Sequence, residues 1–140
     1  MANPPLIAVI DDEDSFLELM KDVLEEEGYR VVIGKVPDDA FTLIRESRPQ
    51  LVVLDLNFRM SAMQGMAILT AMRDDTALVD IPVIVCSAAI DHLKQHGEEF
   101  VTLSAHPLNK PFDLTDLVTL VAELLSVSEP SVPATNTLRP

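Results

Sequence analysis

The chain has 140 residues, of which 48% are hydrophobic and 24% are charged, and its formal net charge is -13. This length suits a single domain with a substantial core. The negative charge opposes binding to nucleic acids and to anionic membranes, because affinity for phosphate groups comes mainly from clustered Lys and Arg. We therefore expect neither a nucleic-acid nor a membrane partner.

The sequence contains no sign of export or membrane insertion. No apolar run approaches the roughly 18 residues that span a bilayer, and no basic region precedes the short apolar stretch near the N-terminus. The single cysteine, Cys86, lies in an apolar run and can form no internal disulfide. These features favour a cytoplasmic protein.

Four short apolar runs rich in β-branched residues show no alternation with polar residues. Such runs are typical of parallel strands that are covered on both faces. They are Leu6–Ile10, Arg30–Gly34, Leu51–Asp55 and Pro82–Cys86. A short fifth strand is expected at His106–Asn109.

Segments with helical spacing of apolar residues separate these runs. The first helix should end at Gly28, and Ala40 and Ile44 belong to the second. The stripe of the first helix consists of Phe16, Leu19, Met20, Val23 and Leu24. Further helices are expected at Gly65–Asp74, Ile90–Leu103 and Leu114–Leu125, with Asp113 as the N-cap of the last.

Strands that alternate with helices predict an α/β fold, a doubly wound five-stranded parallel sheet with helices on both faces. We assign residues 1–125 to this domain. Residues 126–140 are rich in Pro, Ser and Thr and offer little apolar surface to bury. They are expected to form a disordered tail or linker.

Polar residues follow the predicted strands at the edge where ligands bind in open α/β sheets. Asp11 and Asp12 follow the first strand, and Asp55 ends the third. Ser87 follows the fourth strand and Lys110 follows the fifth. Three carboxylates, a hydroxyl and an ammonium group are thus expected to converge.

Three carboxylates in one cleft repel each other unless a cation neutralises them. Oxygen ligands favour Mg²⁺ over zinc, which would be held by His or Cys. A carboxylate can attack a phosphoryl group once a metal ion and an ammonium group offset the charge on the transferring oxygens. The pattern therefore indicates a Mg²⁺ site at which a carboxylate could accept a phosphoryl group.

The sequence resembles the receiver domains of two-component response regulators over about residues 5–125. Four motifs in the family's order carry the resemblance. They are IDDE at Ile10–Glu13, LVVLDLN at Leu51–Asn57, CSA at Cys86–Ala88 and NKPFD at Asn109–Asp113. The family implies a flavodoxin-like sheet with the strand order 2-1-3-4-5.

The resemblance also implies a role for each residue at the predicted site. Asp55 would accept the phosphoryl group. Mg²⁺ would be bound by Asp12, by Asp55 and by the backbone carbonyl of Asn57, while Asp11 would orient a water on the metal.

The two remaining polar residues would contact the phosphoryl group itself. Ser87 would hydrogen-bond a phosphoryl oxygen in the active state, and Lys110 would pair with the phosphoryl group. The family implies a switch that catalyses only its own phosphorylation and dephosphorylation. A sensor histidine kinase or a phosphotransfer protein would supply the phosphoryl group, and a downstream protein would receive the signal.

Three alternatives remain open. Pro107 stands where the family usually has an aromatic residue that swings inward on activation, which suggests a binding module that works without phosphate. A phosphohydrolase with an aspartate nucleophile would need a second acid where this chain has Asn57. A flavodoxin-like cofactor protein would need a phosphate loop where Asp11 and Asp12 would repel phosphate.

Overall fold

The computed structural model describes residues 4–35, 37–55, 62–87, 105–109 and 113–128. Within these ranges five strands form one parallel sheet in the order β2-β1-β3-β4-β5. The strands are β1 (Leu6–Ile10), β2 (Arg30–Gly34), β3 (Leu51–Asp55), β4 (Val83–Ser87) and β5 (Ala105–Asn109). The predicted α/β fold and the strand order are confirmed.

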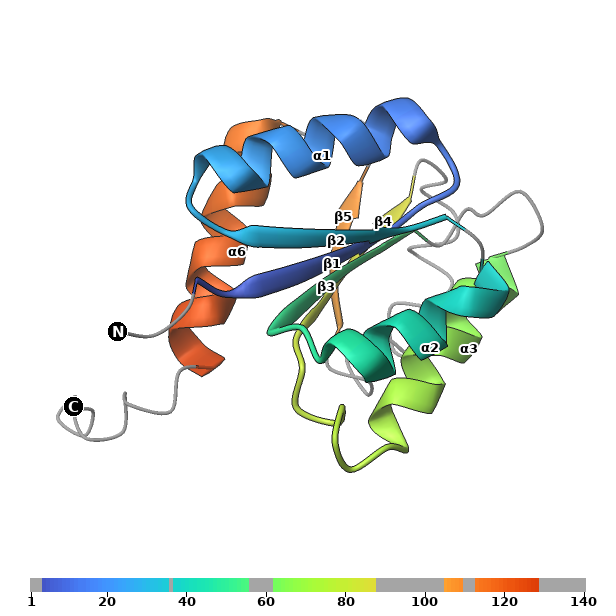
Figure 1. Ribbon diagram of the computed structural model, residues 1–140. Coiled ribbons are helices and arrows are strands. Elements are labelled where there is room, and N and C mark those ends of the chain that lie inside the picture. The colour runs from blue at the N-terminus through green and yellow to red at the C-terminus, as the bar shows by residue number, and fades with distance from the viewer. Residues whose placement is uncertain (1–3, 36, 56–61, 88–104, 110–112, 129–140) are drawn as a thin grey trace, which may run out of the picture.

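Helices cover both faces of this sheet (Figure 1). The helices α1 (Asp14–Glu26) and α6 (Leu114–Ser128) lie on one face. The helices α2 (Pro37–Ser47) and α3 (Ala62–Arg73) lie on the other. The predicted helix at 90–103 lies outside the described residues. Among the helices that the structure describes, none is long and apolar enough to cross a membrane.

The central strands are buried on both faces, which explains why their sequences lack polar alternation. Successive residues of a strand point to opposite faces of the sheet. In β1, Ile7 and Val9 therefore join the core under α1 and α6, whereas Ala8 and Ile10 join the core under α2 and α3. Strands in this position need apolar residues on both sides.

The helix α1 buries part of the predicted stripe, including Met20 and Leu24, but Leu17 faces the core in place of Leu19. Leu17, Met20 and Leu24 are fully buried, whereas Leu19 is 45% exposed. Apolar residues follow one another closely in the first turns, so only packing against the sheet decides which of them face inward. The helix ends before Gly28, whose positive φ of 97° closes its last turn.

Several element boundaries differ from prediction, and β5 begins one residue earlier than predicted, at Ala105. The strand β4 runs from Val83 to Ser87, one position later than predicted, because Pro82 has no N–H for the ladder. The helix α3 begins at Ala62 instead of Gly65, since the cost of one glycine inside a helix is outweighed by packing of the later turns.

The last helix has the predicted cap but a later end. The Thr115 N–H donates to Asp113 Oδ1 over 3.1 Å, which confirms the N-cap. The helix continues to Ser128, so residues 126–128 are helical and not part of a tail. Leu117, Val121 and Leu125 bury its inner face and hold the last turns in place. Residues 129–140 lie outside the described ranges.

A close contact fixes the end of β2 beside the candidate site. A Cβ atom on Gly34 would lie 2.8 Å from Leu43 Cδ2 and 3.0 Å from Ile10 Cδ1. Only glycine therefore lets α2 pack against this strand end without displacing a neighbour. The Gly34 carbonyl accepts a hydrogen bond of 3.1 Å from the Asp11 N–H, which fixes the backbone of the turn into α1.

Candidate functional site

Parallel pairing brings the carboxyl ends of the central strands to one edge of the sheet. Ile10 pairs with Leu54, so Asp11 and Asp55 follow paired residues of neighbouring strands. On the other side of β3, Asp55 itself pairs with Cys86, which directly precedes Ser87. The backbone thus places three of the predicted site residues side by side.

Asp11 is the buried charged residue of the described ranges, with only 1% of its surface exposed. Its Oδ1 atom accepts a hydrogen bond of 3.0 Å from the Glu13 N–H, one of the backbone groups that a helix start leaves without a partner. A buried carboxylate is costly unless hydrogen bonds or a cation compensate it. Its position therefore suits a site that holds a positive charge.

Asp12 is half-buried and lies next to Asp11 at the start of the turn into α1. This turn is bracketed by an ion pair of 2.6 Å between Lys35 Nζ, just after β2, and Asp14 Oδ1, in the first turn of α1. Both side chains are more than half exposed, so the pair contributes little to stability. It shows that the first turn of α1 lies beside the end of β2.

The structure brings part of the predicted site together. Asp11, Asp12, Asp55 and Ser87 lie at one edge, and β5 ends at Asn109, directly before Lys110. Lys110 and Asn57 lie outside the described residues, and for Asp55 and Ser87 the structure describes the backbone.

The donor chemistry of this edge fits the predicted metal ion. No group of three or more His, Cys, Asp or Glu side chains that could hold a metal occurs among the described side chains. Asp11 and Asp12 nevertheless offer carboxylate oxygens beside the end of β3. Oxygen donors without His or Cys suit a hard divalent cation such as Mg²⁺.

The sequence analysis missed Lys35. It directly follows β2, so the same rule that selected Asp11, Asp55 and Ser87 would have selected it. Its ion pair with Asp14 places it beside the turn that carries Asp11 and Asp12. Cys86, by contrast, is a fully buried residue of the core, which agrees with its place in an apolar run.

Comparison with known proteins gives a consistent result. The family model described as response regulator receiver domain matches residues 7–122. The polar-differentiation response regulator DivK of Brucella anthropi is 28% identical over 85 residues, which cover 61% of this chain and 68% of DivK. The DNA-binding response regulator MtrA of Mycolicibacterium smegmatis is 30% identical over 129 residues. The match covers 88% of this chain but 51% of MtrA, so the chain spans about half of that relative.

Solved structures with the same fold include receiver domains and response regulators. The Francisella response regulator 1452 receiver domain has a TM-score of 0.78 at 25% identity, and the match covers 89% of this chain and 99% of that one. A response regulator from Thermotoga maritima has a TM-score of 0.74 at 27% identity, with coverage of 88% and 98%.

Proposed function

From the premise that the chain belongs to the family of response regulator receiver domains, we propose that it is a phosphorylation-dependent switch with Asp55 as the phosphoryl acceptor. One observation carries this assignment. Asp55 ends the central strand β3, directly beside the strand end that leads into Asp11 and Asp12. Receiver domains are signalling switches and not conventional enzymes.

The proposed transfer is a nucleophilic substitution at phosphorus. An oxygen of the Asp55 carboxylate forms a bond to phosphorus, and the bond from phosphorus to the donor breaks. The electron pair of that bond leaves with the donor, which is the imidazole nitrogen of a phosphohistidine or the acetate oxygen of acetyl phosphate. The product is an acyl phosphate on Asp55.

Mg²⁺ is the cofactor that this family generally uses. Asp12, Asp55 and the backbone carbonyl of Asn57 would hold it, and Asp11 would orient a nearby water. When bound, Mg²⁺ offsets negative charge on the transferring oxygens. The buried position of Asp11 supports this assignment, because a cation would compensate the cost of its burial.

Two further residues would act on the phosphoryl group. Lys110 supplies a compact positive charge for the transferring oxygens. Ser87 donates a hydrogen bond from its hydroxyl to one of these oxygens after transfer. Ser87 pairs with Asn109 in the sheet, so Lys110 directly follows the neighbour of Ser87, which supports their joint action.

The proposed partners are proteins. A sensor histidine kinase or a phosphotransfer protein would supply the phosphoryl group, and a downstream protein would bind the phosphorylated surface. MtrA is a DNA-binding response regulator, but this chain spans only 51% of it. The net charge of -13 supports the absence of a nucleic-acid or membrane partner for this chain.

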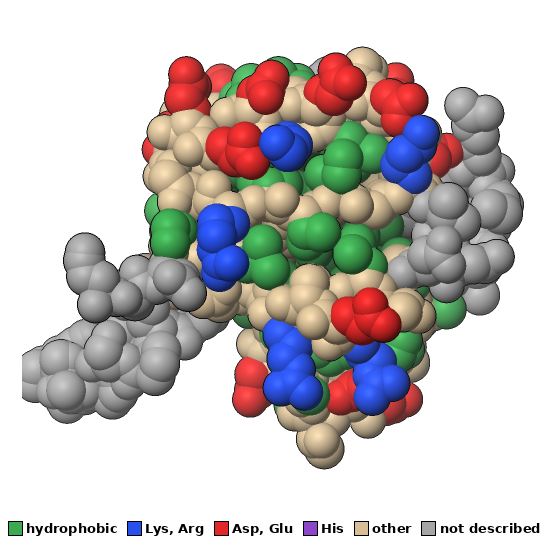
Figure 2. Space-filling view, in the orientation of Figure 1, with side chains coloured by type: hydrophobic (Ala, Val, Ile, Leu, Met, Phe, Trp, Pro, Cys, Tyr) green, Lys and Arg blue, Asp and Glu red, His purple; other side chains and the backbone are tan. Residues whose placement is uncertain are grey.

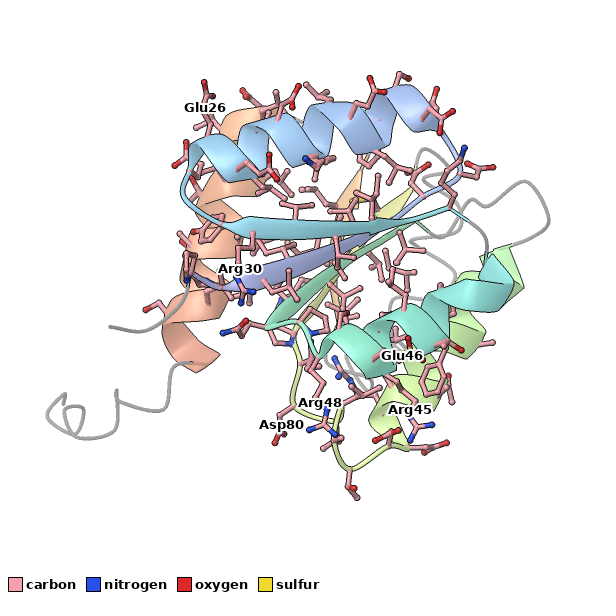
Figure 3. All side chains as sticks on the ribbon, viewed as in Figure 1. Glu26, Arg30, Arg45, Glu46, Arg48 and Asp80 are labelled. Atoms are coloured by element: carbon pink, nitrogen blue, oxygen red, sulfur yellow. The ribbon has the colours of Figure 1, made fainter. Side chains whose placement is uncertain are left out.

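Phosphodonor labelling tests the acceptor directly. With acetyl phosphate and Mg²⁺, intact mass measurement should show one added phosphoryl group on the wild type and none on Asp55→Asn. Asp80→Asn is the matched control, because Asp80 is an exposed carboxylate in the loop before β4, at the other end of the sheet (Figure 3). Full labelling of Asp55→Asn would show that another residue is the acceptor.

A second candidate function is a binding module that works without phosphate. Pro107 favours it, because this exposed residue of β5 has no aromatic ring to swing inward. Beryllofluoride, which mimics a phosphoryl group on a carboxylate, separates the two. A wild type that neither takes up phosphate nor binds beryllofluoride with Mg²⁺ would favour the binding module.

A further inference from the structure

The two edges of the sheet differ in their protection against an added strand. In β5, exposed Pro107 has no N–H to donate, which is typical of a protected edge. The other edge strand, β2, contains no proline. A strand edge with unpaired N–H and C=O groups is a template for another chain, so β2 is the more open edge.

The hydrogen bonds of β2 show which of its backbone groups face outward. The Arg30 N–H donates to Pro5 O over 2.9 Å, and the Gly34 carbonyl accepts from Asp11 over 3.1 Å, so both residues direct these groups toward β1. Backbone groups alternate along a parallel strand. Val31 and Ile33 therefore direct their N–H and C=O groups outward, and no described residue is paired with them.

The side chains along this edge are apolar and incompletely covered. Ile33 is 38% exposed, and Val31 and Val32 are half-buried. Figure 2 shows a strip of apolar side chains along β2, between α1 and α2. A strand added here would bury apolar surface as well as pair its backbone.

The charges beside the strip select the partner. The neighbouring helix α1 carries four exposed carboxylates, those of Glu18, Asp22, Glu25 and Glu26. Figure 2 shows Lys and Arg side chains beside the strip as well. Of the nearby cations, Lys21 pairs with Glu25 and Lys35 pairs with Asp14. Arg30, the first residue of β2, donates from Nε to the Pro4 carbonyl over 2.9 Å. A second copy of this chain would bring a second row of carboxylates and the same net charge of -13. A basic segment would find opposite charges instead.

We propose that the open edge of β2 binds an extended, basic segment of a partner protein by strand addition. Alternate residues of the segment are apolar and pack on the strip, and Lys or Arg residues meet the carboxylates of α1. Backbone hydrogen bonds to Val31 and Ile33 supply affinity, and the side chains supply specificity. This docking does not involve Asp55, so it is independent of the proposed phosphoryl transfer.

A short peptide of alternating Lys and Val, with blocked ends, is the probe. Titrated into isotope-labelled protein, it should shift the amide signals of Val31 and Ile33 and slow their hydrogen exchange. The same peptide with Glu in place of Lys should bind at least about tenfold more weakly, as should a peptide N-methylated at alternate residues on the edge that faces β2.

Two protein variants with a matched control locate the contact. Ile33→Pro removes an outward N–H that the sheet does not use, and Ile33→Lys keeps that N–H but adds a charge that repels the probe. Each should weaken binding about tenfold or more. Val79→Lys makes the same chemical change at a residue that is 39% exposed before β4, and it should bind like the wild type. Asp55→Asn should also bind like the wild type.

Three outcomes would overturn the proposal. The first is no binding of the basic peptide at millimolar concentration. The second is equal binding of the N-methylated peptide, which would show attraction to surface charge without strand pairing. The third is protection of the Ile33 amide in concentrated protein without peptide, together with a dimeric mass, which would make a second copy the occupant.

Discussion

The two ends of the sheet handle polar groups differently. At the amino end, polar side chains complete the backbone of the turns. The Gln50 side chain accepts from the Leu6 N–H over 2.8 Å, and the Gln50 N–H donates to the Leu6 carbonyl over 2.7 Å. At the carboxyl end, Asp11 and Asp12 place two adjacent carboxylates at the edge where β3 also ends.

Arg73 is a second polar side chain at the amino end whose hydrogen bonds go to the backbone. Its Nη1 atom donates to the carbonyls of Val79 at 3.0 Å and Ile81 at 2.8 Å, with Leu78 at the limit of 3.5 Å. Burial lowers the pKa of the guanidinium, while the carboxylate of Asp80 opposes this shift. These bonds fold the loop between α3 and β4.

The comparison separates residues that stabilise the fold from residues that serve a ligand. A polar side chain whose partners are turn carbonyls stabilises the fold. Carboxylates gathered at one strand edge cost folding free energy unless a cation is present. Replacing a structural side chain at the amino end should therefore lower stability with or without metal. Replacing a carboxylate at the carboxyl end should lower only the stability gained from a bound cation.

The largest change in stability is expected for Arg73→Met, which keeps much of the aliphatic stem but removes the charged donor. Several carbonyls of the loop lose their partner, so the free energy of unfolding should fall by about 3 kcal/mol. Chemical denaturation measures this change. Arg45→Met is the control, because Arg45 is 63% exposed and its ion pair with Asp75 should matter little. Equal losses in both variants would contradict the distinction.

The next effect concerns the carboxyl end and appears only with metal. At a Mg²⁺ concentration of about one hundred times the dissociation constant, binding to the folded state should raise stability by about 2.7 kcal/mol. Asp12→Ala should lose most of this increment but fold normally without Mg²⁺. Thermal melts at several Mg²⁺ concentrations measure it, and Asp22→Ala on α1 serves as the control. An unchanged increment in Asp12→Ala would remove Asp12 from the site.

A smaller effect of opposite sign is expected at the amino end. Arg48 follows α2 with a φ of 49°, a conformation that favours glycine. Arg48→Gly relieves this strain but increases the entropy of the unfolded chain, so stability should rise by only about 0.5 kcal/mol. Arg48→Ala keeps the strain and is the control. A glycine variant no more stable than the alanine variant would contradict this reading.

The smallest effect is expected for truncation after Ser128. Leu125 already completes the buried face of α6, and the removed residues contain few large apolar side chains. The melting temperature should stay within about two degrees of the wild type. Differential scanning calorimetry of both chains checks this, and a drop of many degrees would show that the removed segment packs on the domain.

Much of the fold could be predicted because its strands lie between two helical layers. Strands in this position appear in the sequence as apolar runs without polar alternation. The strands β1, β2 and β3 have the predicted bounds. The inward face of α1 could be predicted only in part. Met20 and Leu24 are buried as expected, but Leu17 and Leu19 are equally apolar and only the position of the sheet distinguishes them.

The candidate site could be predicted in part for a similar reason. Parallel strands bring their ends together regardless of sequence distance, which identified Asp11, Asp12 and the positions of Asp55 and Ser87. The ion pair of Lys35 with Asp14 could not be predicted, because it depends on how closely α1 approaches the end of β2.

The position of Cys86 allows its thiol to report local opening of the sheet. It is the single cysteine of the chain, fully buried, and it pairs with Asp55 across the central strands. A thiol reagent can reach it only when the sheet opens there. The labelling rate of the unmodified protein therefore measures how often the strands around the acceptor separate, with no probe introduced.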